Sequence, residues 1–458
     1  MLRKTSQIGI ILCALILVVS LAFIGCTKKE DAAASGTLKG KTIVIGNWWT
    51  NWNVNTYEPA NEEESRQLDW RKKIQTDNGF TMYEEEISGW DDYLQLITNY
   101  ILSRDKKYSS YYVGADWAMS LFRQGLLAPL PSDVIKVSGQ EPSAARQQTG
   151  YGAAMASMFT FGGNQYAMVL NRENESWQTV LVLFNKRLLR EAGIDPETPY
   201  NMQRDGTWTW DAFLDMVRRT TRDNNNDGIT DVYGLASDDD GDVFSAFVYS
   251  NGANLITFDN SGRAVNSSNT PAYLEALQFF NDLYTNGYMM PKPTDAQWAW
   301  NFYNFVDGGT AFFIGQEWFK GMAGDMQDDY GSVLMPKGPR ASNYRVSFTD
   351  NVMVVPNIFT TDEVQDILKA IDLWYVPMSD DYLSGHYGVY RDRRAVEETV
   401  AMTRDSRYIT YRNYMLIPGV NDIYKEFIAA WHEHTGNPAQ LVERFAPRYN
   451  AAIDSFNR

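Results

Sequence analysis

Cysteine is scarce in this sequence of 458 residues, which contains only Cys13 and Cys26. Both lie at the N-terminal end, where Cys13 would be lost if the first 25 residues were removed as a signal. The remaining chain would then have no pair of thiols to form a disulfide, as suits an exported protein that avoids oxidative pairing.

Histidine and catalytic motifs are also scarce. The sequence has three histidines, His386, His432 and His434, and His432-Glu433-His434 lacks the i, i+4 spacing that places two imidazoles on one helical face. No phosphate-binding loop, GxGxxG turn or GxSxG elbow is present. A glycosidase remains an alternative, because it requires only two carboxylates in a Trp-lined cleft.

Basic residues are outnumbered, with 41 Lys and Arg against 57 Asp and Glu and a formal net charge of −16. Removal of residues 1–25, which contain Arg3 and Lys4 and no acid, would change this charge to −18. Binding to a nucleic acid backbone needs a basic surface, so the composition argues against nucleic acid as a partner.

One long hydrophobic run is present, Ile8–Ile24, between a basic start and Gly25-Cys26-Thr27. This is the order of a secretory signal. The residues FIGC resemble a bacterial lipobox, which implies that residues 1–25 are a lipoprotein signal peptide and that Cys26 is lipidated. Residues 26–40, small and polar, would then form a flexible tether. The alternative is an uncleaved membrane anchor, since 17 residues reach the lower limit for spanning.

Aromatic residues are abundant, at 14% of the sequence with 14 Trp, within a hydrophobic content of 44%. This content is ample for folded cores, and the length predicts two lobes rather than one. So many aromatic rings cannot all be buried. We expect part of them to serve as flat platforms for a ligand.

The segment 179–236 alternates strand and helix signals, which indicates an α/β fold. A β-branched run, Thr179–Phe184, precedes a short helix that ends at Gly193, and a second helix begins after a polar loop. Thr209 is the expected N-cap of that second helix, whose buried face is predicted to contain Phe213, Met216 and Val217.

The order FNKRLLREAGID, TWTWDAFLDMVRRTTRD and NNDGITDVYGLA resembles the family 1 extracellular solute-binding proteins of ABC importers. Three other places support the resemblance: Gly46–Trp52 after the first strand, Gly114–Trp117 with the following GLLAPL, and GGTAFFIG followed by Gln316–Phe319. It implies a two-lobe, periplasmic-binding-protein-like fold with a hinge and an interlobe cleft. It also implies capture of a sugar or oligosaccharide, without catalysis, and delivery to a membrane permease.

The expected lobes are discontinuous in sequence. Gln165–Leu170 and Val346–Pro356 are predicted as the two crossings, and Thr360–Glu363 as a capping box after the second. The predicted boundaries are 41–164 and 346–400 for the two segments of lobe 1, 165–345 for lobe 2, and 401–458 for C-terminal helices that pack across the lobes.

The candidate ligand-binding residues follow strand ends, where open α/β sheets bind ligands. We expect two of the three tryptophans after the first strand to face the cleft and at least one to pack in the core. Asp116 either caps a helix or bonds a sugar, and the resemblance implies that Trp318 stacks on the ligand. The full set is Trp48, Trp49, Trp52, Trp90, Asp116, Trp117, Asn171, Glu173, Trp177, Glu317, Trp318 and Asp350.

The loop from Asp223 to Asp231 resembles the first half of a calcium loop, with oxygen ligands at alternate positions and Gly228 at the turn. Its twelfth position is Gly234 instead of Glu. Two interpretations therefore stay open: a structural calcium site or an Asx-rich turn. The calcium site would use Asp223, Asn225, Asp227, Ile229 and Asp231.

Three functions remain on the sequence alone: a sugar-binding lipoprotein of an ABC importer, a glycosidase, and a structural surface lipoprotein. The order of motifs favours the first.

Overall fold

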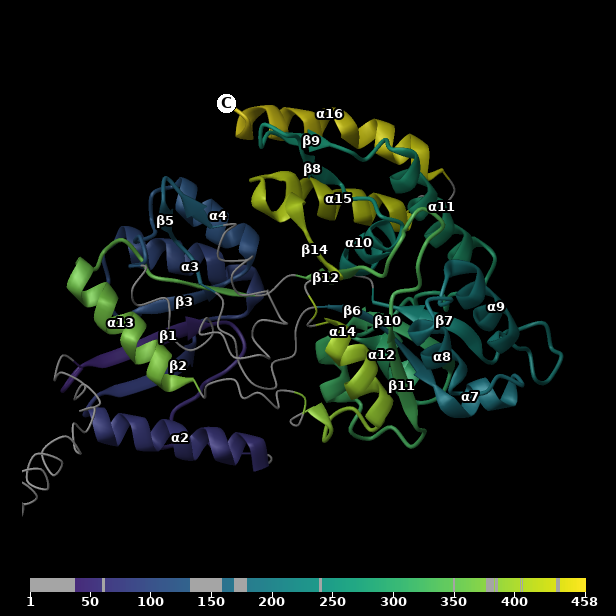
Figure 1. Cartoon of the computed structure of the whole chain (residues 1–458), viewed down its shortest axis with the longest axis horizontal. Coiled ribbons are helices and arrows are strands. Elements are labelled where there is room, and N and C mark those ends of the chain that lie inside the picture. The colour runs from purple at the N-terminus through teal and green to yellow at the C-terminus, as the bar shows by residue number, and fades with distance from the viewer. Residues whose placement is uncertain are drawn as a thin grey trace, which may run out of the picture.

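The computed structural model of the chain describes residues 38–59, 62–131, 159–168, 179–238, 241–348, 351–375, 383, 386–403, 405, 407–433 and 437–458. They form two α/β lobes that lie side by side, each built on a four-stranded sheet (Figure 1). Over these residues no helix combines the length and the apolar character needed to cross a bilayer.

Lobe 1 contains a sheet in which three parallel strands carry one antiparallel edge strand, in the order β13-β3-β1-β2. In β1 the side chain of Val44 packs on one face, and those of Ile43 and Ile45 pack on the other. Burial on both faces explains the continuous apolar sequence of this strand. The strands are β1 Thr42–Asn47, β2 Thr81–Glu86, β3 Ser110–Val113 and β13 Val352–Val354.

Helices cover both faces of this sheet. The core on one face contains residues of α3 and α4, and the core on the other contains residues of α2 and α13. The predicted capping box is confirmed, since the Thr360 hydroxyl accepts from Glu363 N and the Glu363 carboxylate accepts from Thr360 N. The remaining elements of lobe 1 are α2 Glu62–Asn78, α3 Trp90–Leu102, α4 Ala115–Arg123, α13 Thr361–Trp374, β4 Thr160–Phe161 and β5 Asn164–Gln165.

Lobe 2 contains a mixed sheet in the order β11-β6-β10-β7. β10 is parallel to β7 and antiparallel to β6, which is also antiparallel to β11. Every residue of β6, β10 and β11 is buried, so this sheet forms the centre of the largest core. Its strands are β6 Val180–Asn185, β7 Tyr233–Ser237, β10 Thr310–Gln316 and β11 Tyr330–Leu334.

Helices pack around the lobe 2 sheet. Thr209 is the N-cap of α9 as predicted, its hydroxyl accepting from Ala212 N, and Phe213, Met216 and Val217 are buried. The other elements are α7 Lys186–Glu191, α8 Thr198–Arg204, α9 Trp210–Thr220, α10 Gly241–Ser250, β8 Ile256–Phe258, β9 Ala264–Asn266, α11 Pro271–Thr285, α12 Trp300–Val306 and η1 Glu317–Met322.

The chain passes between the lobes after β12, Val346–Phe348. β12 pairs with β14, Ile409–Tyr411, and contacts α10 of lobe 2, whereas β13 belongs to the lobe 1 sheet. This crossing lies inside the predicted segment 346–356.

The chain then returns to lobe 2 earlier than the boundary predicted at residue 400. The π-helical turn η3, Ala395–Val400, contacts β11, and Arg394 pairs with Glu197 of lobe 2. These ion pairs and buried contacts hold the segment against lobe 2. The segment is rich in Tyr and Arg, and its sequence did not indicate a regular element. Residues 386–403 therefore lie with lobe 2, although the sequence predicted 346–400 as a return to lobe 1.

The C-terminal elements pack mainly on lobe 2 and touch lobe 1. α15 and α16 contact each other, α10, α11 and β9, while η4 contacts α4 of lobe 1 (Figure 1). The guanidinium of Arg123 in α4 lies 5.6 Å from the ring centre of Phe456. These elements are α14 Ala401–Thr403, η4 Asn413–Leu416, α15 Val420–Glu433 and α16 Pro438–Phe456.

Candidate ligand-binding cleft

The turn after β1 presents Trp48 at the carboxyl end of the strand. The buried side chain of Asn47 accepts hydrogen bonds from the backbone N–H groups of Trp49 and Thr50, both at 2.9 Å. A Cβ at Gly46 would lie 2.9 Å from the ring of Tyr111, so glycine permits the close packing beneath this turn. The backbone therefore turns sharply at the point where the sheet ends.

An aromatic cluster forms the lobe 1 wall. The Trp48 ring centre lies 5.0 Å from that of Trp90, 5.3 Å from Tyr93 and 5.4 Å from Trp117, each in an edge-to-face arrangement. Trp90 remains 45% exposed, whereas Trp117 and Tyr93 are buried. The buried rings thus support two indoles that present apolar surface at the front.

A second pair of indoles comes from lobe 2. Trp318, just after β10, packs on Phe319 with ring centres 3.9 Å apart. The rings of Trp298 and Trp318 are parallel to within 2°, with centres 5.9 Å apart, and Trp298 is 72% exposed. Ala299 follows Trp298 with a φ of 59°, a left-handed conformation that residues with a side chain seldom adopt. This conformation is unfavourable in free energy, and it lies beside the most exposed of these indoles.

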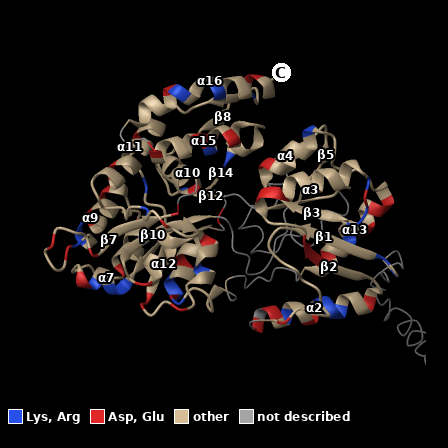
Figure 2. Ribbon diagram, turned by 180° about the vertical axis from the view of Figure 1, so that it is seen from behind, with Lys and Arg blue, Asp and Glu red and all other residues tan. Residues whose placement is uncertain are grey.

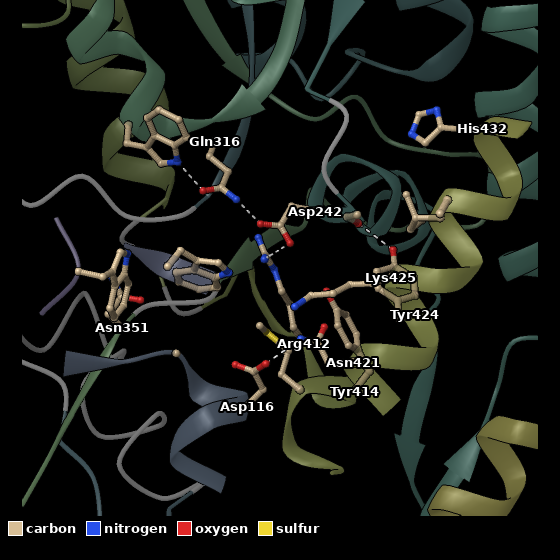
Figure 3. Close-up of a pocket in the computed structure, with 18 of the residues that line it drawn as sticks. Asp116, Asp242, Gln316, Asn351, Arg412, Tyr414, Asn421, Tyr424, Lys425 and His432 are labelled. Atoms are coloured by element: carbon tan, nitrogen blue, oxygen red, sulfur yellow. Dashed lines mark hydrogen bonds and ion pairs between the residues drawn. The ribbon is translucent and has the colours of Figure 1, made fainter. Parts of the chain in front are cut away.

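A polar network lies between the two aromatic walls (Figure 3). Asp242, in the first turn of α10, pairs with the Arg412 guanidinium and accepts a hydrogen bond from Gln316. The Gln316 carbonyl in turn accepts from the Trp318 indole N–H. The Arg412 side chain is 2% exposed; burial alone would lower its pKa, but the charge of Asp242 raises it above the usual range. The pair is thus charged and oriented in the wall.

Asp116 joins the lobes across one side of the cleft. Gly114 is the N-cap of α4, so Asp116 is not the capping residue, and its Oδ2 accepts a 2.7 Å hydrogen bond from the Asn421 amide of α15. Burial raises the pKa of Asp116, while the Asn421 bond and the Lys425 charge oppose that shift.

These walls enclose a cavity of about 790 Å³ between the lobes. Its volume is within the range of small-molecule sites. From lobe 1 it is lined by Trp48, Trp90, Gly114, Asp116 and Asn351. From lobe 2 and the C-terminal elements it is lined by Gly241, Asp242, Lys292, Trp298, Gln316, Trp318, Arg412, Tyr414, Met415, Asn421, Tyr424, Lys425, Ile428, Ala429 and His432.

The sequence pattern of the bacterial extracellular solute-binding proteins matches residues 85–357, more than half of the chain. The chain belongs to this family. The match covers the whole lobe 2 sheet and strands β3 and β13 of the lobe 1 sheet, and it stops just after β13. No curated protein sequence matches this solute-binding protein.

Solved structures similar to this solute-binding protein have the two-lobe, periplasmic-binding-protein-like fold. The ABC substrate-binding protein Lmo0181 from Listeria monocytogenes, in complex with cycloalternan, is 17% identical, with a TM-score of 0.63 over 90% of this chain and 99% of that one. The cyclic alpha-maltosyl-1,6-maltose binding protein from Arthrobacter globiformis is 16% identical, with a TM-score of 0.62 over 90% and 99%. UgpB from Mycobacterium tuberculosis, in complex with glycerophosphocholine, is 15% identical, with a TM-score of 0.64 over 86% and 96%.

Four residues predicted for the site of this solute-binding protein line the cavity: Trp48, Trp90, Asp116 and Trp318. Trp49 is exposed next to Trp48 and packs on Tyr112, and it is not among the lining residues. Trp117 lies behind Trp90, with ring centres 4.2 Å apart, and supports the wall instead of facing the cavity.

Two predicted residues are buried away from the cavity. Trp52 is 6% exposed because its ring stacks on Tyr57 at 4.3 Å and lies 4.0 Å from the Arg71 guanidinium. Glu317 is buried because it forms an ion pair with Lys320 at 2.9 Å and accepts from Tyr390 at 2.8 Å. Both were predicted as ligand-binding residues, but they are core residues that do not line this cavity, and Trp52 is the tryptophan of the three that packs in the core. Four others, Asn171, Glu173, Trp177 and Asp350, lie outside the described residues, as does Cys26.

The oxygen-rich loop of this solute-binding protein is folded as a series of Asx turns. Asp223 accepts from Asn226 N and Gly228 N, Asn225 from Asp227 N, Asp227 from Ile229 N, and Asp231 from Asn224 N. Throughout the ranges that the structure describes, no three His, Cys, Asp or Glu side chains gather in a group suited to a metal ion. The loop oxygens face backbone N–H groups here, so the calcium site stays a prediction that needs a direct test.

Sequence reasoning missed the polar part of the cleft. Asp242 and Arg412 are 170 positions apart, and no motif connects them. Asn421, Lys425, Ile428 and His432 recur at helical spacing along one face of α15, which is a signal that could have been found. Gln316 lies in the predicted segment Gln316–Phe319 but was not among the candidate ligand-binding residues.

Proposed function

We propose that this solute-binding protein captures a sugar or oligosaccharide in the cleft and delivers it to the membrane permease of an ABC transporter. The observation that carries the proposal is the pairing of indole surfaces from opposite lobes, Trp48 and Trp90 against Trp298 and Trp318, around one cavity. Sugars present apolar C–H faces that suit indole rings.

The polar groups of the cleft suit the hydroxyl groups of a sugar. Gln316, Asn351 and Asn421 supply amides that both donate and accept, and Asp116 supplies a carboxylate that accepts. The Asp242–Arg412 pair is oriented by its own hydrogen bonds, so it supplies fixed charges rather than mobile ones. Apolar platforms combined with a few oriented polar groups are typical of small-molecule sites.

The proposed mechanism needs no bond-breaking chemistry. A ligand that contacts both lobes only when they are close together binds that arrangement more tightly, and its binding free energy shifts the population toward the closed form. The permease would recognise that closed form. Hinge motion between two lobes is a common way to close a site.

The structural neighbours support this class of ligand without fixing it. Lmo0181 is in complex with cycloalternan, and the Arthrobacter globiformis protein binds cyclic alpha-maltosyl-1,6-maltose. UgpB, with the same fold, is in complex with glycerophosphocholine. The four indoles of the present cleft are the reason to favour a carbohydrate here.

We also propose that the protein is anchored to the outer face of the cell membrane through a lipid on Cys26. Membership of an extracellular family implies that the protein is exported. The lipobox-like residues before Cys26 support lipidation of that cysteine. The segment 26–40 would let the two lobes reach a permease without leaving the surface. A single acyl chain binds a membrane only weakly, so stable anchoring through Cys26 requires that the lipid-modified residue carry more than one acyl chain.

Calorimetric titration with a panel of mono- and oligosaccharides tests the proposal. We expect one or more sugars to bind at one site per chain and to change the tryptophan fluorescence. The double variant Trp48→Ala, Trp318→Ala is the control and should lose both signals. No binding by the wild type across the panel would contradict the proposal, and hydrolysed sugar after the titration would favour a glycosidase.

A further inference from the structure

A buried pair of opposite charges lies in the wall of the cleft. Figure 2 shows most charged residues on the helices and loops of the two lobes, for example on α2 and α7. Asp242 and Arg412 differ from these residues, because their side chains are 10% and 2% exposed and form an ion pair. The desolvation of two charges offsets most of their attraction, so such a pair is weak evidence for a gain in stability. The hydrogen bonds of the pair to other residues indicate what else it does.

The pair fixes the orientation of the Gln316 amide. Gln316, the last residue of β10, donates from its amide nitrogen to one carboxylate oxygen of Asp242, and Arg412 donates to the other oxygen. A carboxylate only accepts hydrogen bonds, so the amide nitrogen of Gln316 must face it and the amide oxygen must point the other way. The opposite orientation would place the amide oxygen against the carboxylate.

The amide oxygen of Gln316 in turn accepts a hydrogen bond from the indole N–H of Trp318. Arg412, Asp242, Gln316 and Trp318 thus form one network of hydrogen bonds, which Figure 3 draws as dashed lines. Because the carboxylate sets the direction of the amide, it also places an acceptor opposite the indole N–H. The network therefore selects the edge of the Trp318 indole that faces the wall.

Packing holds the same ring in its plane. The ring centres of Trp318 and Phe319 are 3.9 Å apart, and the ring of Trp298 is parallel to that of Trp318 to within 2°. Trp318 is only half-buried, so part of its ring remains available to a ligand in the cavity. A side chain that is oriented before binding loses less conformational entropy when the ligand arrives.

We propose that Gln316 and the Asp242–Arg412 pair are positioning residues that hold the Trp318 indole in the orientation that stacks on the sugar. This inference rests on the proposed function, because it concerns the affinity of the same cleft for a carbohydrate. It is compatible with a hydrogen bond from Gln316 to the sugar, and the experiments below separate the two roles. It also links Arg412, which directly follows β14, to the aromatic wall of lobe 2.

The first experiment follows the indole N–H without any ligand. The protein is labelled with 15N-tryptophan, and hydrogen exchange of the Trp318 indole N–H is measured by NMR, with its signal assigned from Trp318→Phe. Gln316→Met removes the amide at similar side-chain length and should speed this exchange. The indole N–H of Trp208 is the internal reference: it is buried and bonded to the Leu334 carbonyl at 2.8 Å, so its exchange should stay the same.

A further variant tests the ion pair without leaving a buried charge unpaired. Asp242→Asn combined with Arg412→Met removes both charges together. The new amide can donate as well as accept, so it no longer dictates the orientation of Gln316. Exchange of the Trp318 indole N–H should be faster in this double variant, although Trp318 and its acceptor Gln316 are both unchanged.

A double-mutant cycle on affinity separates orientation of the indole from direct contact with the sugar. A sugar that the wild type binds is titrated by calorimetry. Gln316→Met should weaken its binding about two- to tenfold, as expected for the loss of one hydrogen bond. The same substitution should weaken binding less in Trp318→Phe, which keeps an aromatic ring but has no N–H to orient.

Gln203→Met is the matched control. Gln203 of α8 is also a buried glutamine of lobe 2 with both ends of its amide bonded, since it donates to Thr399 and accepts from Leu334 N. It is not among the residues that line the cavity. This variant should lose stability but keep wild-type affinity and wild-type exchange of the Trp318 indole N–H.

Three results would overturn the inference. Unchanged exchange of the Trp318 N–H in Gln316→Met would show that the bond does not hold the indole. Unchanged exchange in the double variant would remove the Asp242–Arg412 pair from the network. Equal losses of affinity from Gln316→Met with Trp318 and with Trp318→Phe would assign Gln316 to direct contact with the sugar. Absence of sugar binding by the wild type would contradict the proposed function and the stacking role with it, whereas the exchange rates would still show whether the network holds the indole.

Discussion

Asn421, at the start of α15, donates a 2.7 Å hydrogen bond to the carboxylate of Asp116 in α4, although the two residues are 305 positions apart. Asp116 belongs to lobe 1, and α15 packs on α10 of lobe 2. Both residues line the cavity. The bond therefore links the lobes at the wall of the cleft, and any relative motion of the lobes acts on it.

The first prediction concerns this bond. Asp116→Ala and Asn421→Ala should be less than additive in a double-mutant cycle of denaturant unfolding, with a coupling of about 0.5 kcal/mol or more, because each removes the same interaction. Asp116→Ala combined with a change of Lys72, an exposed residue of α2, to Gln is the control and should be additive. Additivity in both pairs would show that the bond contributes nothing to stability.

A pH dependence follows from the burial of Asp116. Burial raises its pKa, so the folded protein retains this proton to a higher pH than the unfolded chain, and the charged form costs stability above the folded pKa. That cost disappears as the pH falls through the folded pKa to about 3.9, the unfolded value. The melting temperature of Asp116→Asn minus that of the wild type should therefore be greater at pH 7 than at pH 4. A difference of the opposite sign would mean that the folded pKa is lowered.

Substitution of the exposed Trp298 separates an effect on ligand affinity from an effect on stability. Trp298→Ala should weaken binding of a sugar that the wild type binds in the calorimetric panel by about 1–4 kcal/mol, the loss expected of an aromatic anchor. Its melting temperature should hardly change, because this side chain is mostly exposed. Trp318→Ala should lose both affinity and stability, since its ring also packs on Phe319. Trp49→Ala is the control, being exposed but outside the cavity lining, and wild-type affinity for Trp298→Ala would remove that indole from the site.

Calcium binding by the loop at Asp223–Asp231 is tested by chelation. If the loop binds calcium, chelator should lower the melting temperature of calcium-loaded wild type and leave that of Asp227→Ala unchanged, because a ligand of the native state stabilises it by mass action. Asp259→Ala, in another exposed Asx turn, is the control and should respond as the wild type does. Equal melting of the wild type with and without chelator would show that the loop is only a turn.

The anchor prediction concerns Cys26. Cys26→Ser should abolish incorporation of radiolabelled fatty acid and either release the protein from the membrane fraction or leave an unprocessed precursor. Cys13→Ser, inside the predicted signal peptide, should be labelled and fractionated as the wild type is. Labelled Cys26→Ser that stays with the membrane would contradict the lipobox interpretation.

Features set by neighbouring residues were predictable from the sequence. The caps at Thr209 and Thr360 depend on hydrogen bonds within three residues, and the buried runs of β1 and β6 depend on β-branched and apolar residues. Trp48 and Trp318 were predictable for a related reason, because side chains just after a buried strand of such a sheet lie at its ligand-binding edge.

Features set by tertiary contacts were not predictable. Arg412 reaches Asp242 because the C-terminal segment folds back over lobe 2, and no local pattern encodes that path. Trp52 looked equivalent to Trp48 in sequence, but Arg71 and Tyr57 pack against it and draw it into the core. Glu317 looked like a polar cleft residue, yet Lys320 and Tyr390 satisfy it inside the lobe.

The central claim is that one carbohydrate lies between the two lobes and contacts aromatic side chains of both. The most direct measurement is a crystal structure of the protein with an oligosaccharide that it binds in the calorimetric panel. The account predicts intact sugar rings against Trp48 or Trp90 on one side and against Trp298 or Trp318 on the other. A sugar bound outside this cavity, or in contact with one lobe alone, would contradict the account.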